Sequence, residues 1–181
     1  KDMSFIAHLL EQGLDPYLIE WGERGVDDHE ASLDDFIERG IGGAADHIRS
    51  GRSVEKVALF GHCIGGTFAA MYAALYPEKV DRLFTLTAPF TRPERGVLAT
   101  MTDPLMLPID QLVDGFGQMP AKLIRYTFMG LKPYYELMKW KMFVENLGND
   151  DAMARFAIID KWANDNVDIP AEVFRSFIRQ V

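Results

Sequence analysis

The feature that most constrains the fold is a segment in which an apolar strand pattern runs directly into a glycine-rich turn and then a helix. Val57–Phe60 is apolar, and the following turn reads Gly-His-Cys-Ile-Gly-Gly before an alanine-rich run of helix formers. Small residues around a nucleophilic side chain in such a turn are typical of a nucleophile elbow. Gly61 and Gly65 lie two residues before and two after Cys63, where neighbouring backbone approaches closely. The pattern predicts Cys63 as a nucleophile and the backbone N–H of Ile64 as an oxyanion donor.

A simpler interpretation of Cys63 competes with this one. A lone cysteine in an intracellular protein is usually a small buried hydrophobe. The surrounding sequence favours the functional interpretation, because four apolar residues precede the motif and helix formers follow it. An elbow requires that context on both sides of the glycines.

Composition narrows the class of protein. The chain has 181 residues, of which 48% are hydrophobic and 25% charged, and this balance predicts one globular domain with a substantial core. A net charge of -8 argues against a broad basic surface for nucleic acid. The single cysteine excludes an intrachain disulfide framework and fits a reducing compartment, so we expect a cytoplasmic location. The longest apolar runs, such as Phe68–Tyr76, fall short of the roughly 20 residues that span a bilayer, so no transmembrane segment is expected. Because the chain opens Lys-Asp-Met, we expect a fragment of a longer protein.

The first half of the chain alternates helical and strand patterns, which predicts an α/β fold with a parallel sheet. Ser32-Leu-Asp-Asp35 resembles a capping box, and the helix that follows is weakened by Gly40, Gly42 and Gly43. An open sheet of this kind usually has more than three strands, so we expect further strands on both sides. The expected elements are a helix over 2–13, a strand over 16–21, a polar loop over 22–31, a helix over 32–51, a strand over 57–60, a helix from the elbow to 76 and a strand over 82–87.

The second half changes character. Five of the nine prolines fall between Pro89 and Pro120, which predicts an irregular boundary loop, and seven of the nine methionines lie from Met101 onward. An all-helical insert after an elbow is typical of a cap whose methionine and aromatic side chains would line a pocket for an apolar acyl chain. Any single one of these side chains is better explained as core, so we name no binding residue among them. We therefore divide the chain into an elbow-bearing core over 1–90 and a helical cap over 91–181. The expected helices are 121–130, 134–147, 150–163 and 171–181.

The elbow needs a general base, and the sequence does not supply one in the expected order. A histidine activates such a nucleophile and an acidic residue orients the histidine, in the chain order nucleophile, acid, histidine. The four histidines are His8, His29, His47 and His62, and none of them follows Cys63. His62 adjoins the nucleophile and is interpreted as a packing residue. The aspartates that follow in the proline-rich stretch would still need a histidine partner: Asp103, Asp110 and Asp114.

Six motifs of the chain carry a family resemblance: Tyr17–Gly22, Ser32–Ile37, Gly61–Gly66, Glu145–Asn149, Lys161–Asp165 and Glu172–Phe177. Together they resemble polyhydroxyalkanoate synthases, most closely the short, two-subunit class. The elbow is the most specific of these motifs, because such enzymes carry cysteine where lipases carry serine. The resemblance covers nearly the whole chain and implies a partial α/β-hydrolase fold followed by a helical cap, with the catalytic Asp and His beyond residue 181. Glu20 departs from the pattern, which commonly has Asp before Trp.

The resemblance implies acyl transfer through a cysteine thioester. The Cys63 thiolate would attack a hydroxyacyl-CoA, the Ile64 N–H would hold part of the oxyanion, and the acyl group would pass to the hydroxyl end of a growing polyester. The implied partners are hydroxyacyl-CoA, the polyester, and a second synthase subunit or a second copy of the chain. The implied location is cytoplasmic, at the surface of polyester granules. No metal is expected, and no cofactor beyond the coenzyme A of the substrate.

Two other functions stay open. A thioesterase would use the same elbow with water as the acceptor, and a catalytically incomplete homologue would act as a binding subunit. Because no histidine follows Cys63, we expect residues 1–181 alone to be inactive as a synthase.

Overall fold

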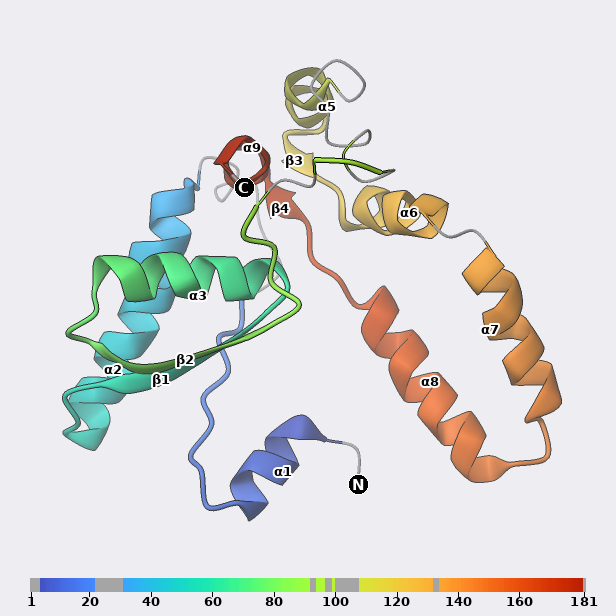
Figure 1. Ribbon diagram of the computed structural model, residues 1–181, viewed down its shortest axis with the longest axis horizontal. Helices are drawn as coiled ribbons and strands as arrows, with labels where there is room; N and C mark the ends of the chain where they lie inside the picture. The colour runs from blue at the N-terminus through green and yellow to red at the C-terminus, as the bar shows by residue number, and fades with distance from the viewer. Residues whose placement is uncertain are drawn as a thin grey trace.

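The computed structural model describes residues 4–21, 31–91, 94–96, 99, 108–131 and 134–180. In Figure 1 the first half of the chain forms a block of strands and helices, and α7 and α8 extend away from it as a pair. The described elements of the first half are α1 (Phe5–Glu11), η2 (Asp35–Gly42), α2 (Gly43–Arg52), β1 (Val57–His62), α3 (Ile64–Leu75) and β2 (Val80–Leu86). Those of the second half are α5 (Ile109–Phe116), β3 (Gln118–Met119), α6 (Ala121–Leu131), α7 (Tyr134–Glu145), α8 (Asp150–Asn164), β4 (Ile169–Pro170) and α9 (Ala171–Gln180).

The central sheet consists of β1 and β2, which pair in parallel with Phe60 opposite Phe84 and His62 opposite Leu86. The predicted parallel arrangement is therefore confirmed for these two strands. Helix α3 connects them and lies along one face of the sheet (Figure 1). Apolar side chains from η2, α2, β1, α3 and α9 fill the space on that side. The buried members of this first core are Leu33, Ile37, Ile41, Ala45, Val57, Phe68, Tyr72 and Val173.

The opposite side of the sheet leaves apolar side chains exposed. Phe84 and Leu86 of β2 are each slightly more than half exposed, and Phe60 of β1 is half exposed. The ring of Phe5 in α1 lies 5.0 Å from the ring of Phe60 and covers part of this face. Parallel sheets are normally covered on both faces. The expectation of further strands in the complete protein therefore stays a prediction, and this exposed face is consistent with it.

A second core lies beside the first and shares helix α9 with it. Strands β3 and β4 pair antiparallel, and Val113, Met119 and Phe174 are buried around them. The adjacent residues Val173 and Phe174 of α9 belong to the first and the second core, respectively. Helix α9 therefore joins the two parts of the chain.

The helix predicted over 32–51 begins as a π-helix, η2, and continues as α2. Its capping box is confirmed, because the Asp35 carboxylate accepts hydrogen bonds from the Ser32 N–H at 3.0 Å and the Ser32 hydroxyl at 2.8 Å. These bonds, led by that from the backbone, lower the pKa of Asp35. The glycines have a packing reason: a Cβ on Gly40 would lie 2.6 Å from the Trp21 ring, and one on Gly42 would lie 3.1 Å from the Tyr72 ring.

Two sequence-based expectations are wrong. The apolar segment 16–21 does not form a strand among the described residues. Ile19 and Trp21 instead pack on the first core, with the Trp21 ring stacked 4.7 Å from the Phe36 ring. The stretch 89–120, expected to be irregular, contains helix α5, whose apolar face buries Val113. The polar loop expected over 22–31 lies almost entirely outside the described residues. The four later helices are confirmed to within a few residues as α6, α7, α8 and α9.

Candidate active site

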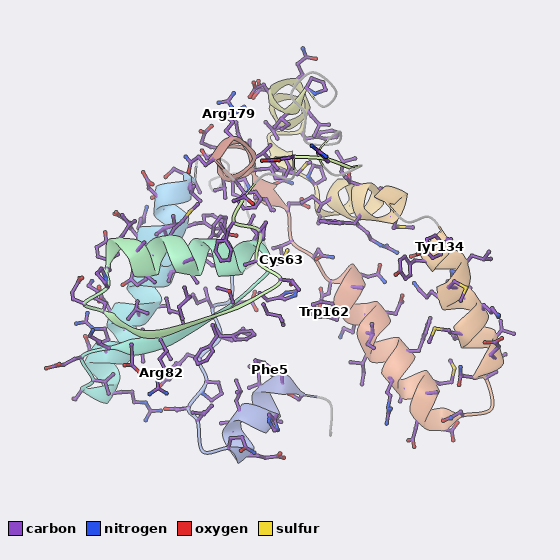
Figure 2. All side chains as sticks on the ribbon, in the orientation of Figure 1. Phe5, Cys63, Arg82, Tyr134, Trp162 and Arg179 are labelled. Atoms are coloured by element: carbon purple, nitrogen blue, oxygen red, sulfur yellow. The ribbon has the colours of Figure 1, made fainter. Side chains whose placement is uncertain are left out.

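Cys63 occupies the turn between β1 and α3, as the elbow pattern predicts (Figure 2). Its φ is 52° and its ψ is -131°, a backbone conformation that non-glycine residues rarely adopt. The thiol is exposed, and its side chain makes no capping hydrogen bond to α3. The predicted strained turn is therefore confirmed, and its sulfur is accessible for chemistry.

The glycines around Cys63 allow close contact between the strand and the helix. A Cβ on Gly61 would lie 2.4 Å from the Gly66 Cα and 2.5 Å from the Gly65 carbonyl oxygen. A Cβ on Gly66 would lie 2.6 Å from the Cβ of Ala88. A Cβ on Gly65 would meet nothing within 4 Å. The predicted need for a small residue is confirmed at Gly61 but is wrong at Gly65, because α3 turns the next glycine, Gly66, toward the loop after β2.

The end of β2 holds the turn in place. The Cys63 N–H donates a hydrogen bond to the Leu86 carbonyl at 2.9 Å. The next residue, Thr87, also has a positive φ of 52°. The buried Thr67 hydroxyl of α3 donates to the Pro89 carbonyl at 2.5 Å and so fastens the following loop to the helix. The strained residues Cys63 and Thr87 therefore follow the ends of the neighbouring strands β1 and β2. The hydrogen bonds from the Cys63 N–H and the Thr67 hydroxyl stabilise this region.

Ile64 is the first residue of α3. The first N–H groups of a helix have no acceptor within the helix and carry the positive end of its dipole. The Gly66 N–H donates to the Cys63 carbonyl at 2.8 Å, which closes the first turn directly behind the nucleophile. The position of Ile64 therefore suits the oxyanion role, which stays a prediction.

No histidine acts as a base for Cys63 in the part of the chain that the structure describes. His8 lies on α1 and His47 on α2, both exposed, while His29 lies outside the described residues. The hydrogen bonds among described residues include none from an imidazole to the Cys63 thiol. His62 is exposed at the end of β1, and its ring makes a contact described below.

The candidate acids that the structure describes form ion pairs between two helices. Asp110 and Asp114 lie on α5 and bind Arg175 of α9, at 2.8 Å and 2.5 Å, respectively. Arg179 also binds Asp110 at 2.9 Å. These carboxylates therefore fasten α5 to α9, and Asp103 lies outside the described residues.

A residue that sequence reasoning did not select lies close to the elbow. The ring of Trp162, in the last turn of α8, lies 5.7 Å from the ring of His62 at an angle of 50° (Figure 2). The two residues are a hundred positions apart. Each lies in a motif of the family resemblance, Gly61–Gly66 and Lys161–Asp165, but neither motif indicates that the two rings touch. This contact places α8 beside the candidate nucleophile.

Within the described ranges, no group of three or more His, Cys, Asp and Glu side chains is arranged to hold a metal ion. None of the described helices is both long enough and apolar enough to cross a membrane.

Comparisons with known proteins agree with this geometry. The family model described as alpha/beta hydrolase fold matches residues 3–158. The chain therefore belongs to the alpha/beta hydrolase fold family, as its parallel strands and elbow indicate.

Relatives narrow the resemblance within that family. The chain is 37% identical to the poly(3-hydroxyalkanoate) polymerase subunit PhaC of Allochromatium vinosum, over 99% of this chain and 50% of that protein. It is 33% identical to the PhaC subunit of Haloferax mediterranei, over 99% of this chain and 37% of that protein. It is 32% identical to the PhaC subunit of Synechocystis, over 97% of this chain and 48% of that protein. The resemblance to polyhydroxyalkanoate synthases is confirmed, and the chain spans about half or less of these relatives' length.

Proposed function

We propose that this chain is the nucleophile-bearing part of a polyester synthase that transfers hydroxyacyl groups from coenzyme A to a growing polyhydroxyalkanoate. The observation that carries the proposal is the exposed thiol of Cys63 at a strained turn, in a chain whose relatives are poly(3-hydroxyalkanoate) polymerase subunits. Strain of this kind persists at functional sites because the surrounding structure holds it. Here the Leu86 carbonyl and the glycine contacts at Gly61 and Gly66 do so.

The first half of the proposed reaction loads Cys63. The thiolate attacks the thioester carbonyl, a sulfur–carbon bond forms, and the oxyanion of the tetrahedral intermediate receives a hydrogen bond from the Ile64 N–H. Collapse of the intermediate breaks the bond to the sulfur of coenzyme A, which leaves and takes up a proton. One thioester replaces another, so the acyl group remains activated.

The second half extends the polymer. The hydroxyl at the end of the polyester attacks the acyl group on Cys63, an ester forms, and the Cys63 thiol is regenerated. A histidine base oriented by an aspartate would accept the hydroxyl proton in this step. No histidine follows Cys63 in residues 1–181, so in this proposal both residues come from another part of the protein.

The helices beyond residue 90 are proposed to be the cap over the site. Helix α8 meets the elbow through Trp162, and α7 is fastened to α8 by the ion pair between Lys139 and Asp160 at 2.6 Å. Such a lid would exclude water and favour transfer to a hydroxyl. The second synthase subunit or second copy, and a location at the granule surface, belong to the same proposal.

The decisive experiment supplies 3-hydroxybutyryl-CoA to the complete protein and follows both coenzyme A release and polymer. We expect polyester to form with little free 3-hydroxybutyrate, and Cys63→Ala to abolish both signals while the fold is retained. Stoichiometric free 3-hydroxybutyrate without polymer would instead identify a thioesterase. Absence of both coenzyme A release and acylated Cys63 would favour a binding subunit.

A further inference from the structure

The contact between His62 and Trp162 joins two parts of the chain that are otherwise fastened separately. His62 ends β1 and directly precedes Cys63, whereas Trp162 lies in the last turn of α8. Their ring centroids are 5.7 Å apart, within the range in which aromatic rings attract one another. The Trp162 side chain is 65% exposed, so this contact is not part of a larger buried core.

The strand pattern explains why His62 is available for this contact. Along β1, Val57 and Gly61 are buried against the α3 side, while Phe60 and His62 are exposed. Phe60 meets Phe5 of α1, and His62 meets Trp162 of α8. Two successive outward positions of one strand therefore each meet an aromatic ring from a distant helix.

The segment that carries Trp162 is held together by its own contacts. We name residues 134–164, which comprise α7 and α8, the α7–α8 hairpin. Lys139 binds Asp160 at 2.6 Å across the two helices, and the rings of Phe143 and Phe156 lie 5.0 Å apart. Asp160 is only two residues before Trp162. A displacement of Trp162 from His62 would therefore move both helices.

We propose that His62 and Trp162 are a positioning pair that sets the distance between the α7–α8 hairpin and the Cys63 thiol, and so limits the size of the acyl group that reaches it. The inference rests on the proposed function for the substrate class, but it concerns access to the thiol and not the chemical step. Large apolar side chains on the hairpin give it a surface that an acyl chain would contact. Those most exposed are Leu137, Met142, Val144, Leu147, Ile159 and Trp162.

The expected size of the effect follows from the strength of one aromatic pair. Loss of such a contact shifts an equilibrium between near and distant hairpin positions by about 2- to 10-fold. When the hairpin is in a distant position, the access of bulky molecules to the thiol increases more than the access of small ones. The selectivity of Cys63 for small over bulky thiol reagents should therefore fall by that factor when the contact is removed.

The single cysteine of this segment permits a direct test. The complete protein is prepared with any cysteine outside residues 1–181 replaced by serine. The rate of alkylation of Cys63 is measured with N-ethylmaleimide and with a dodecyl maleimide. The readout is the rate constant for N-ethylmaleimide divided by that for the dodecyl maleimide. The variants are His62→Ala, Trp162→Ala, both together, and the ring-retaining His62→Phe and Trp162→Phe. Arg155→Ala, at an exposed polar position on the same helix, is the matched control.

Both single alanine variants should lower the ratio by about 2- to 10-fold, and the double variant should lower it no further. The phenylalanine variants and Arg155→Ala should retain it. An unchanged ratio in the alanine variants, an additive double variant, or phenylalanine variants that behave like alanine would overturn the proposal. If Trp162→Ala fails to fold, His62→Ala and Trp162→Leu decide the matter in the same way. Alkylation does not require polymer synthesis, so failure here is distinguishable from failure of the synthase assignment.

Discussion

Gly61 and Gly66 approach so closely that a Cβ on the first would lie 2.4 Å from the Cα of the second. Backbone on both sides forms this contact, so no side chain can move aside to relieve it. The turn that presents Cys63 therefore depends on two glycines that face each other, one at the end of β1 and one in the first turn of α3.

Alanine at these two positions should destabilise the protein. We expect Gly61→Ala and Gly66→Ala each to cost about 1–3 kcal/mol of unfolding free energy, because the added methyl has no space. Gly65→Ala is the matched control, because a Cβ there meets nothing within 4 Å. It should be neutral or stabilising by up to about 1 kcal/mol, since alanine favours a helix over glycine. Urea denaturation of the three variants measures this, and equal losses at all three positions would contradict the assignment of Gly66.

Relief of the backbone strain at Cys63 should increase the free energy of unfolding. Cys63→Gly accepts the positive φ without strain, so it should be more stable than Cys63→Ala by about 1 kcal/mol. Both variants should lack turnover. Thermal unfolding compares the two proteins, and an alanine variant as stable as the glycine variant would show that the turn relaxes without the thiol.

Tyr72 carries a buried hydroxyl for which the described structure shows no hydrogen-bond partner. Burial raises the pKa of this phenol, and an unpaired buried hydroxyl costs stability. We expect Tyr72→Phe to be neutral or to stabilise the protein by about 1 kcal/mol. Tyr76→Phe is the control, because the Tyr76 hydroxyl donates to Glu38 at 3.0 Å. Denaturant midpoints measure both, and a clear loss of stability in Tyr72→Phe would indicate a partner for the hydroxyl, such as a buried water.

The carboxylate of Asp46 should make part of the stability depend on pH. It binds Lys79 at 3.0 Å and Arg49 at 2.7 Å, and these bonds, that from Lys79 foremost, lower its pKa below the ordinary value of 3.8. A lowered pKa in the folded state stabilises the protein above the unfolded pKa, and this contribution is lost as the pH falls through the folded value. Asp46→Asn should therefore be less stable than the parent near neutral pH and nearly equal to it well below pH 3.8.

Unfolding at both pH values checks this prediction. Asp34→Asn serves as the control, because Asp34 forms no ion pair with any described residue. A difference between Asp46→Asn and the parent that stays the same at both pH values would mean that the ion pairs do not cause it.

Residues 1–181 alone should lack synthase activity. The Cys63 thiol and the proposed oxyanion donor, the Ile64 N–H, lie in this segment, but every histidine either precedes or adjoins Cys63. The purified segment should still react with N-ethylmaleimide at Cys63, because the thiol is exposed. Turnover of 3-hydroxybutyryl-CoA at the rate of the complete protein would contradict the expectation.

Local patterns were sufficient for the elbow and for most helices, because strand, glycine turn and helix are adjacent around Cys63. They failed where a segment is shaped by distant parts of the chain. Residues 16–21 have the apolar pattern of a buried strand, and Ile19 and Trp21 are indeed partly buried. They pack on the first core, however, and the described residues of this segment form no strand. The role of Gly66 depends on Ala88, and the contact of His62 depends on Trp162, so neither could be read from spacing.

Helix α9 has a consequence for how the chain folds. Val173 belongs to one core and the adjacent Phe174 to the other, and the ring of Phe177 lies 6.0 Å from that of Phe68. Neither core is complete until α9 has packed against it, although the segments that α9 joins are far apart in sequence. The composition changes near residue 90, but we do not expect the two halves to unfold independently there. Loss of either core would remove packing contacts from the other. Unfolding should therefore be cooperative across both halves, because α9 couples them.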